Sequence, residues 1–446
     1  MGAPHPVSVD DAADRLLSRL PRPVRLLAAV SGGSDSTGLL VAFARRRHPG
    51  VEILAVTVDH GLRPESAAEA EEVAALCRVL GISHSIRRWT GDKPATGIAA
   101  AAREARYGLL CAEADEVGAT VILTGHTLDD QIETVMMRAA RRDDPIAPGL
   151  AGMAEAVLLH RRRWLLRPFL HTRREPIRAY LHAMGRNWIE DPSNSDPGSE
   201  RARTRMALTG SSPVSPAEIE AAGANRTRLA DAAAAWLDRH AQVRRGVLMH
   251  VAPEGLHADP AVLRYALSMS AAVLGGREQA PSGDVMERIV QACRAPASWR
   301  MTAGRVVFDC HRSGLYLCRE TRDLPPLPIQ ALCAASETAV LWDGRFRIGG
   351  SVAPEALSTA PIRREPAMEL FPDAPPSVAM RAARSMPPCC HTGTGSPAAE
   401  CACLPILAPF DRFLPQFDYN LAAVLAKLIG CDDFPAVPFA DSVRKR

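Results

Sequence analysis

The sequence predicts an α/β protein in which an N-terminal parallel sheet is followed by smaller helical and mixed α+β regions. Over the first 200 residues, short apolar runs alternate with longer helical patterns, which is typical of a parallel sheet covered on both faces. A turn rich in glycine and serine directly follows the first apolar run, at the end of the strand where open parallel sheets bind their ligands. A stretch rich in serine and proline at 209–216 then indicates a linker.

The elements of the N-terminal region follow from hydrophobic patterning. The predicted strands, rich in valine, leucine and isoleucine, are 25–30, 51–58 and 119–124. The predicted helices between and after them are 36–47, 65–80, 97–117 and 129–142. Because the carboxyl ends of parallel strands lie at one edge of the sheet, we expect the polar residues after each strand to gather there.

The C-terminal half is predicted to contain more than one small region. An alanine-rich stretch at 217–242 predicts a long helix. The further predicted elements are helices at 260–274 and 282–294, strands at 305–309 and 314–318, and a strand-rich piece at 339–348. Residues 358–405 are rich in proline, alanine, serine and glycine, so we expect them to be poorly ordered in part. The predicted domains are therefore 1–208, 209–320 and 321–446.

Composition excludes several classes of protein. A chain of 446 residues that is 47% hydrophobic and 23% charged is neither wholly disordered, collagen-like nor a disulfide mini-protein. The net charge of +3 does not by itself indicate a nucleic-acid partner. Only three of the 53 basic residues are lysine, which reflects either codon usage or the suitability of arginine for phosphate.

Location is expected to be cytoplasmic, without a membrane partner. The 11 cysteines are odd in number and mostly scattered, which fits reduced thiols better than a disulfide framework. No apolar run reaches the roughly 20 residues that a membrane span needs. The first ten residues do not resemble a secretory signal.

The segment 31–36, which reads SGGSDS, carries the strongest chemical signal. Two glycines let the backbone turn sharply, and backbone N–H groups, serine hydroxyls and a helix N-terminus then favour a bound phosphate. Asp35 would repel that phosphate unless a divalent cation lay between them, and Mg²⁺ suits carboxylates together with phosphate oxygens. The alternative is an ordinary turn with an aspartate at a helix start.

Five blocks together carry a resemblance to a known family. SGGSDS resembles the pyrophosphate-binding loop of the N-type ATP pyrophosphatases, the PP-loop superfamily. Residues 125–134 (GHTLDDQIET) are similar to a block of the tRNA(Ile)-lysidine synthase family. The remaining matches are 58–63 (VDHGLR), 101–107 (AAREARY) and 188–194 (WIEDPSN). They occur in the family's order within residues 24–206, so the resemblance covers the predicted N-terminal domain, and the C-terminal half matches weakly.

The resemblance implies an activity. The family uses ATP to adenylate the carbonyl oxygen of the wobble cytidine in an isoleucine tRNA with a CAU anticodon. The amine of L-lysine then displaces AMP, which gives lysidine and pyrophosphate. Such chemistry needs neutralisation of charge at the α-phosphorus, a task for Mg²⁺ and arginine.

The same resemblance assigns roles to particular residues. Nucleotide binding is expected from Ser31, Gly32, Gly33, Ser34, Asp35, Ser36, Asp59 and His126. Asp35 and Asp130 are the expected metal-linked carboxylates, and Asp35, Arg106 and Asp130 are the expected catalytic residues. Alternatives remain: Asp129 at a helix cap, His126 as an ordinary loop histidine, and Arg106 on a solvated helix face.

The lysine amine must also lose a proton before it can attack. Because the pKa of the amine is about 10.4, less than about 1% of it is unprotonated at pH 7. A nearby base would therefore help. Asp130, Asp59 and Glu133 are candidates that the sequence does not rank.

Clusters of arginine are candidates for tRNA contacts. Residues 160–178 contain seven arginines and one glutamate, with Trp164 available for stacking. Two smaller clusters are Arg138, Arg141 and Arg142, and Arg201, Arg203 and Arg205. Solvated faces are the alternative for each. The resemblance favours Arg205, although this chain reads RARTR where the family often has an aromatic residue followed by Arg-Asn-Arg.

Two rival functions remain. One is another amide-forming PP-loop ligase of the NAD or asparagine synthetase type, and the other is a non-catalytic nucleotide- or RNA-binding module. Sulfur transfer is disfavoured, because the N-terminal half has only Cys77 and Cys111, both in helical patterns. Cysteines between 389 and 403 lack the spacing usual for structural zinc. The sequence does not predict an oligomeric state.

Overall fold

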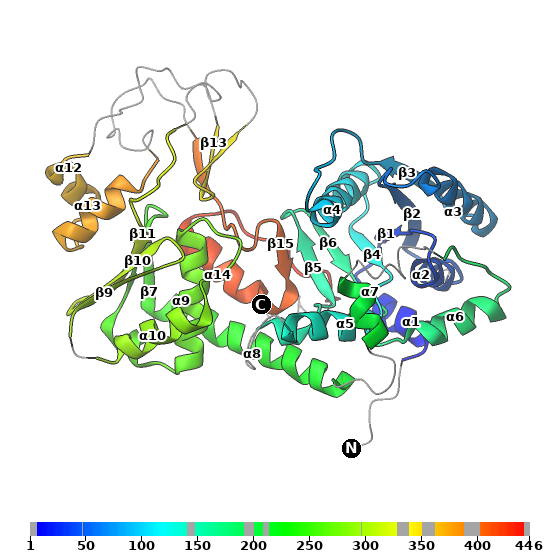
Figure 1. Cartoon of the computed structure of the whole chain (residues 1–446), viewed down its shortest axis with the longest axis horizontal. Coiled ribbons are helices and arrows are strands. Elements are labelled where there is room, and N and C mark those ends of the chain that lie inside the picture. The colour runs from blue at the N-terminus through cyan, green and yellow to red at the C-terminus, as the bar shows by residue number, and fades with distance from the viewer. Residues whose placement is uncertain are drawn as a thin grey trace. The chain divides into compact units, whose positions relative to one another are not determined.

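The protein is described by a computed structural model. It describes residues 7–46, 48–140, 148–190, 200–207, 214–295, 297–327, 339–349, 362–387 and 402–440. The chain forms two compact units (Figure 1). The first comprises Met1–Arg226, Pro415–Phe417 and Pro435–Arg446, and the second comprises Thr227–Leu414 and Asp418–Phe434. One boundary therefore falls inside helix α8 (Pro216–His240), so the division at 208 and 320 stays a prediction.

The first unit is built on a largely parallel sheet, as the alternation of strands and helices predicts. Its strands are β1 (Val24–Ala29), β2 (Val51–Asp59), β3 (His84–Arg88), β4 (Val121–Thr124), β5 (Ala156–Leu159) and β6 (Arg163–Leu166). They lie in the order β5-β6-β4-β1-β2-β3. Only β5 runs antiparallel to its neighbour among these strands.

The register of the central strands places their ends together. Ala29 of β1 pairs with both Thr124 of β4 and Val56 of β2. The loops that follow β1 and β4 therefore begin side by side at the carboxyl edge of the sheet. This edge holds the SGGSDS and GHTLDD segments.

Helices cover the sheet of the first unit (Figure 1). They are α1 (Val9–Arg19), α2 (Ser34–Ala44), α3 (Ser66–Leu80), α4 (Ile98–Glu116), α5 (Leu128–Ala139), α6 (Arg174–Ala183) and α7 (Glu200–Ala207). Helix α2 is buried almost all round, and Leu39 and Phe43 are fully enclosed. It packs closely on α6, because a Cβ at Gly38 would lie only 2.3 Å from Ile177 Cγ2.

The second unit contains two antiparallel sheets. One has the order β7-β8-β11-β10-β9, formed by β7 (Ala241–Arg244), β8 (Leu248–Val251), β9 (Trp299–Ala303), β10 (Val306–His311) and β11 (Gly314–Arg319). The other is β12 (Val340–Trp342), β13 (Phe346–Gly349) and β14 (Ala402–Pro405). The helices are α9 (Pro260–Leu274), α10 (Gly283–Cys293), α12 (Arg364–Leu370), α13 (Pro376–Arg384) and α14 (Tyr419–Ile429). Strand β15 (Phe413–Pro415) spans a boundary between the units.

The proline-rich stretch 358–405 contains two helices, α12 and α13, within its described residues 362–387. The expectation that the stretch is poorly ordered in part stays a prediction. Both helices contribute fully buried side chains to a hydrophobic core, among them Ala367, Phe371 and Val378. Alanine and valine at helical spacing therefore outweigh the proline-rich composition. In the described part of the chain, no helix is both long and apolar enough to cross a bilayer.

Candidate functional site

The SGGSDS loop joins β1 to α2 and has the backbone geometry of an anion cradle. Gly32 has a φ of 88°, a left-handed conformation that a side chain would strain. Gly33 is the N-cap residue of α2 and makes no side-chain cap. The N-cap residue therefore supplies no side-chain acceptor at the positive end of the helix dipole, an arrangement that favours a bound anion.

Hydroxyl groups hold this loop in shape. Ser36 Oγ donates to the Gly33 carbonyl at 3.1 Å and accepts from the Ser31 backbone N–H at 3.2 Å. Thr37 Oγ1 donates to the Gly32 carbonyl at 3.0 Å. Ser31 itself is exposed, whereas Ser34 is buried. The loop is consequently ordered by its own residues before any ligand binds.

Two segments that are distant in the sequence pack against the loop. The Ile189 N–H donates to the Gly32 carbonyl at 2.9 Å, and a Cβ on Gly32 would lie 2.5 Å from Ile189 Cδ1. A Cβ on Gly125 would lie 2.7 Å from the carbonyl oxygen of Asp35. The fold thus brings together three of the sequence blocks: SGGSDS, GHTLDDQIET and the described residues 188–190 of WIEDPSN.

Arg174, the first residue of α6, lies between the two aspartates that the sequence predicts as metal-linked. Its Nε lies 2.9 Å from Asp35 Oδ2, and its Nη2 lies 3.0 Å from Asp130 Oδ1. Its Nη1 lies 3.9 Å from Glu133 Oε1. Sequence reasoning predicted the convergence of Asp35 and Asp130 but treated Arg174 only as part of a basic segment.

Burial and charge shape the ionisation of this cluster. Burial raises the pKa of Asp35, and the negative charge of Asp130 adds to that increase, while Arg174 opposes it. Burial would lower the pKa of Arg174, but the carboxylates of Asp35 and Asp130 outweigh it and raise that pKa. The arginine is therefore a permanent cation at the centre of the cluster.

The neighbouring aspartates of GHTLDD have different roles. Asp130 forms a capping box with Thr127 at the start of α5: Asp130 Oδ2 accepts from the Thr127 N–H at 2.7 Å. Its other oxygen remains for Arg174. Asp129 instead accepts the Arg174 backbone N–H at 2.7 Å and contacts Arg173 Nη1 at 3.2 Å. Asp129 therefore anchors the start of α6 rather than capping α5.

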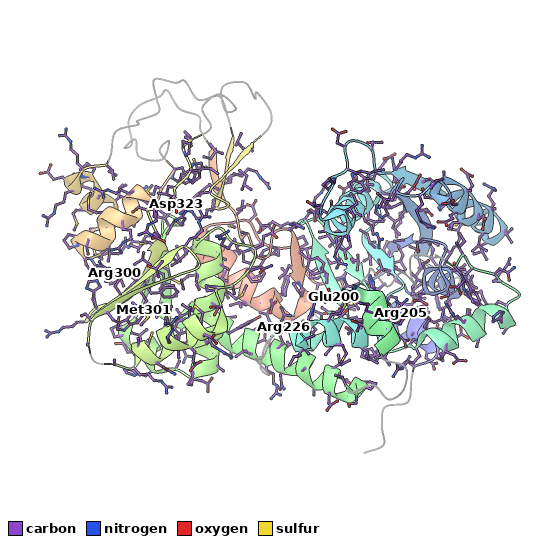
Figure 2. All side chains as sticks on the ribbon, viewed as in Figure 1. Glu200, Arg205, Arg226, Arg300, Met301 and Asp323 are labelled. Carbon is purple, nitrogen blue, oxygen red and sulfur yellow. The ribbon has the colours of Figure 1, made fainter. Side chains whose placement is uncertain are left out.

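Glu133 extends the cluster towards α7. It is 2% exposed, and its Oε1 lies 2.7 Å from Arg205 Nε. Arg205 lies on α7 (Figure 2). The structure thus places the arginine that the resemblance favours beside the candidate site. Arg203 is exposed on the same helix, and the side chain of Arg201 lies outside the described residues.

The carboxylate of Asp59, at the end of β2, is used in hydrogen bonds within the protein. It is 3% exposed and accepts from the Gly61 N–H at 2.7 Å and from Arg88 Nε at 3.0 Å. Burial would raise its pKa, but hydrogen bonds from Ser66 and Gly61 and the charge of Arg88 lower it. Nearby, Lys93 Nζ donates to the Gly61 carbonyl at 2.7 Å. The Asp59 carboxylate therefore orders its own loop.

His126 follows β4, and Arg106 lies on α4. His126 Nδ1 lies 3.0 Å from Thr124 Oγ1, which fixes the ring at the end of β4. Arg106 is exposed on α4. Burial lowers the pKa of His60, which follows Asp59, and the charge of Arg106 lowers it further. Arg106 thus acts electrostatically on the loop after β2.

The basic segment 160–178 does not form a free arginine surface. Its residues 163–166 are strand β6, and Trp164 is 3% exposed, so the prediction that Trp164 stacks on bases is wrong. Arg163 Nε lies 2.7 Å from Asp115 Oδ1, and Arg178 Nη2 lies 2.9 Å from Glu190 Oε1. Arg167 is 1% exposed and donates to the Ala154 carbonyl at 2.7 Å. Several of the segment's charges are thus used within the fold.

The cysteines agree with a reduced protein core. Cys77 and Cys111 are buried in helices, as predicted, and burial raises the pKa of each to about 11. Cys389, Cys390, His391 and Cys401 lie outside the described residues, as do Arg141 and Arg142.

Among the residues that are described, no group of three or more His, Cys, Asp or Glu side chains is arranged to hold a metal ion.

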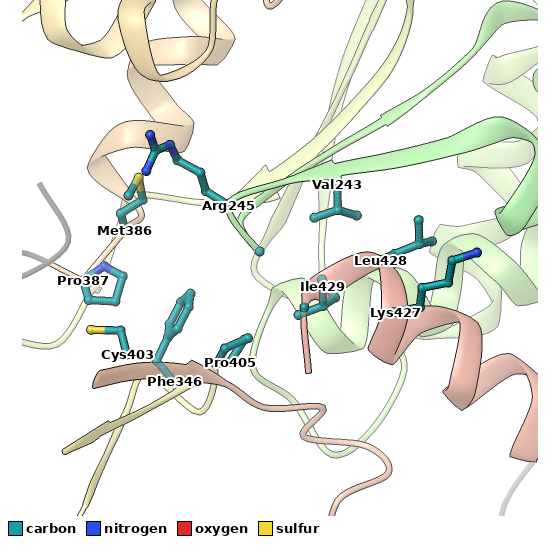
Figure 3. A pocket seen from close by; sticks show the side chains of 12 residues that line it. Val243, Arg245, Phe346, Met386, Pro387, Cys403, Pro405, Lys427, Leu428 and Ile429 are labelled. Carbon is teal, nitrogen blue, oxygen red and sulfur yellow. The ribbon is translucent and has the colours of Figure 1, made fainter. Parts of the chain in front are cut away.

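A cavity of about 460 Å³ lies in the second unit (Figure 3). Its walls include Phe346, Met386, Pro405 and Ile429, with Arg245 among the lining residues. None of the residues predicted for nucleotide binding contributes to it. The candidate site is thus the carboxyl edge of the parallel sheet.

Comparison with known proteins agrees with this location. Residues 8–211 match the family model described as a PP-loop domain. The chain is 42% identical to the tRNA(Ile)-lysidine synthase of Rhizobium meliloti over 98% of both chains. It is 40% identical to that of Mesorhizobium japonicum, covering 96% of this chain and 97% of the relative. The enzyme of Brucella anthropi is 39% identical, over 76% of this chain and 77% of the relative.

Proposed function

Because the chain belongs to the tRNA(Ile)-lysidine synthase family, we propose that it ligates L-lysine to the wobble cytidine of isoleucine tRNA with a CAU anticodon. ATP adenylates the base carbonyl oxygen, pyrophosphate leaves, and the lysine amine then displaces AMP. The observation that carries this proposal is the glycine-serine loop at the N-terminus of α2, with Asp35 and Asp130 converging beside it. The reaction is proposed to occur in the cytoplasm.

The loop 31–36 binds the pyrophosphate part of ATP. Its backbone N–H groups and the N-terminus of α2 supply positive potential without a lysine. Ser31 is exposed and is proposed to offer its hydroxyl group to the phosphate, while the buried Ser34 and Ser36 contribute through the backbone of the loop that Ser36 holds in shape. These parts are ordered in advance, so little reorganisation is needed when charge develops on the leaving group.

Mg²⁺ fits the donor set of the site. Asp35 and Asp130 already direct one oxygen each at a single cation, the guanidinium of Arg174. Mg²⁺ favours one or two carboxylates together with phosphate oxygens and water. It would neutralise charge on the phosphates, while Arg106 and His126 are proposed to contact the transferring adenylate.

The lysine substrate brings an ammonium group that has to lose a proton. Asp59 is unsuited to that task, because its hydrogen bonds hold its own loop and its pKa is lowered. Asp130 and Glu133 remain the proposed partners of the ammonium. The tRNA is proposed to contact Arg205 and the exposed Arg203, together with Arg201.

One assay tests the proposal against its rivals: release of pyrophosphate from ATP with lysine, with and without CAU-anticodon isoleucine tRNA. We expect release to require both lysine and tRNA. Release without tRNA would favour an amide-forming ligase of the NAD or asparagine synthetase type. No release under any condition would favour a nucleotide- or RNA-binding module.

Asp35→Asn provides the residue-level test. The variant should lose turnover, because an amide cannot supply the negative charge that the cation needs, and it should melt within a few degrees of the wild type. Asp14→Asn is the matched control, since Asp14 pairs with Arg46 away from the loop. An active Asp35→Asn enzyme would remove the metal argument.

A further inference from the structure

Arg174 occupies the position between the two carboxylates that are proposed to face the metal. The guanidinium uses separate nitrogens for Asp35 and Asp130, at 2.9 and 3.0 Å. All three side chains are largely buried, with exposed fractions of 20% for Arg174, 18% for Asp35 and 11% for Asp130. A cation therefore already balances both carboxylates in the protein without its substrates.

From this geometry we propose that Arg174 is an internal counter-cation that blocks divalent metal binding until nucleotide arrives. The inference deepens the proposed function and rests on it in one respect, namely that the nucleotide enters together with a divalent cation. Arg174 acts as a positioning residue in this role. It sets the order in which the site fills.

Charge balance is the physical basis of the block. Buried carboxylates without a partner are costly, so Arg174 is stably held while the site is empty of substrate. A metal ion approaching alone would have to displace this guanidinium and would leave a buried arginine without its partners. Nucleotide changes the balance, because its phosphates supply further oxygen ligands to the metal and a new anion for the guanidinium.

The backbone of Arg174 is anchored separately from its side chain. The Arg174 N–H is held by Asp129 at 2.7 Å, and Arg173 also contacts Asp129. The Arg174 Nη1 lies 3.9 Å from Glu133 Oε1, so a third carboxylate lies beside the guanidinium. Arg205 Nε binds that carboxylate at 2.7 Å. A rotation of the Arg174 side chain would thus release Asp35 and Asp130 without unfolding the start of α6.

Mn²⁺ binding, followed by electron paramagnetic resonance of the free ion, tests the inference on the full chain. Wild-type protein should bind Mn²⁺ weakly without nucleotide and more tightly with α,β-methylene-ATP. Arg174→Gln should bind Mn²⁺ at least about tenfold more tightly than wild type in the absence of nucleotide, because no guanidinium has to leave the two carboxylates first. Its melting temperature should also rise more on addition of Mn²⁺.

Two variants complete the design. Arg173→Gln is the matched control: it removes the neighbouring guanidinium, which contacts Asp129 instead, and should leave Mn²⁺ affinity unchanged. Arg174→Lys keeps a positive charge beside the carboxylates and should stay close to wild type. If Arg174→Gln binds Mn²⁺ no more tightly than wild type, or if Arg174→Lys gains as much as Arg174→Gln, the inference is wrong.

The two proposals fail in different ways. If wild-type protein releases no pyrophosphate with lysine and tRNA, the proposed function fails whatever the Mn²⁺ result. If wild-type protein turns over but Arg174→Gln shows no change in nucleotide-free Mn²⁺ affinity, only the role of Arg174 fails.

Discussion

Gly125 shows how closely two parts of the site approach each other. A side chain there would meet the backbone of the phosphate loop, because its Cβ would lie 2.7 Å from both the carbonyl carbon and oxygen of Asp35. Backbone atoms cannot give way as a flexible side chain can. The glycine is therefore required by packing between the loops after β4 and β1.

Gly125→Ala should consequently displace the phosphate loop. We expect a loss of stability of about 1–3 kcal/mol from overpacking, measured by urea unfolding, together with reduced pyrophosphate release. Gly108→Ala is the control, because nothing lies within 4 Å of its Cβ position in α4. That variant should be stabilised by up to about 1 kcal/mol. Equal stability of Gly125→Ala and wild type would contradict the packing argument.

Asp59 gives a prediction for pH. Its pKa in the folded protein is lowered from the ordinary 3.8, so its bonds contribute stability that is present above the unfolded pKa. That contribution is lost as pH falls through the lower folded pKa. Asp59→Asn should therefore cost stability at pH 7 and a smaller amount near the acid limit of folding. Urea midpoints across the acid range provide the measurement, and a constant difference would exclude the linkage.

At the scale of elements, α5 carries most of the acidic cluster, and its first turn is fixed by the capping box of Thr127 and Asp130. Asp130 thereby supports the helix with one oxygen and contacts Arg174 with the other. The helix start and the candidate site are ordered by the same carboxylate.

Thr127→Ala should loosen both the start of α5 and the position of Asp130 in the candidate site. Loss of the cap is expected to cost about 1 kcal/mol, and freer motion of Asp130 should lower pyrophosphate release. Thr127→Ser keeps the hydroxyl and should restore both quantities. Thermal melting and the release assay measure them, and a fully active, fully stable Thr127→Ala protein would show that the capping box does not position Asp130.

The elements also show where sequence reasoning reaches its limit. The central strands and helices were predictable because their apolar runs alternate with helical patterns. Strand β6 was not predicted, because Arg163 and its arginine neighbours resemble an RNA-binding segment. Only the structure shows that Arg163 pairs with Asp115. Asp35 and Asp130 follow from their motifs. Arg174 does not, because its partners lie 139 and 44 residues away in the chain.

For the whole molecule, a net charge of +3 understates the basic character of the chain. Arg174 and Arg205 lie beside largely buried carboxylates, whereas Arg203 is exposed on α7 and is therefore the more accessible of the proposed tRNA contacts. Binding dominated by phosphate contacts weakens steeply as salt displaces the protein from the RNA.

The affinity for CAU-anticodon isoleucine tRNA should therefore fall linearly with salt on logarithmic axes. Arg203→Gln should weaken binding and reduce that slope by about 1, as measured by filter binding at several salt concentrations. Arg87→Gln is a control at an arginine engaged with Glu113 and Glu116. A slope that does not respond to Arg203→Gln would exclude Arg203 from the phosphate contacts.

The hydrogen bond between Lys93 and the Gly61 carbonyl has a practical consequence. The chain has only three lysines, and Lys93 is the sole one before residue 427. Acylating reagents directed at primary amines therefore have a single internal target in that long stretch, next to the loop after β2. A fluorophore attached there would report on the loop after β2 while every arginine around the phosphate loop kept its native chemistry.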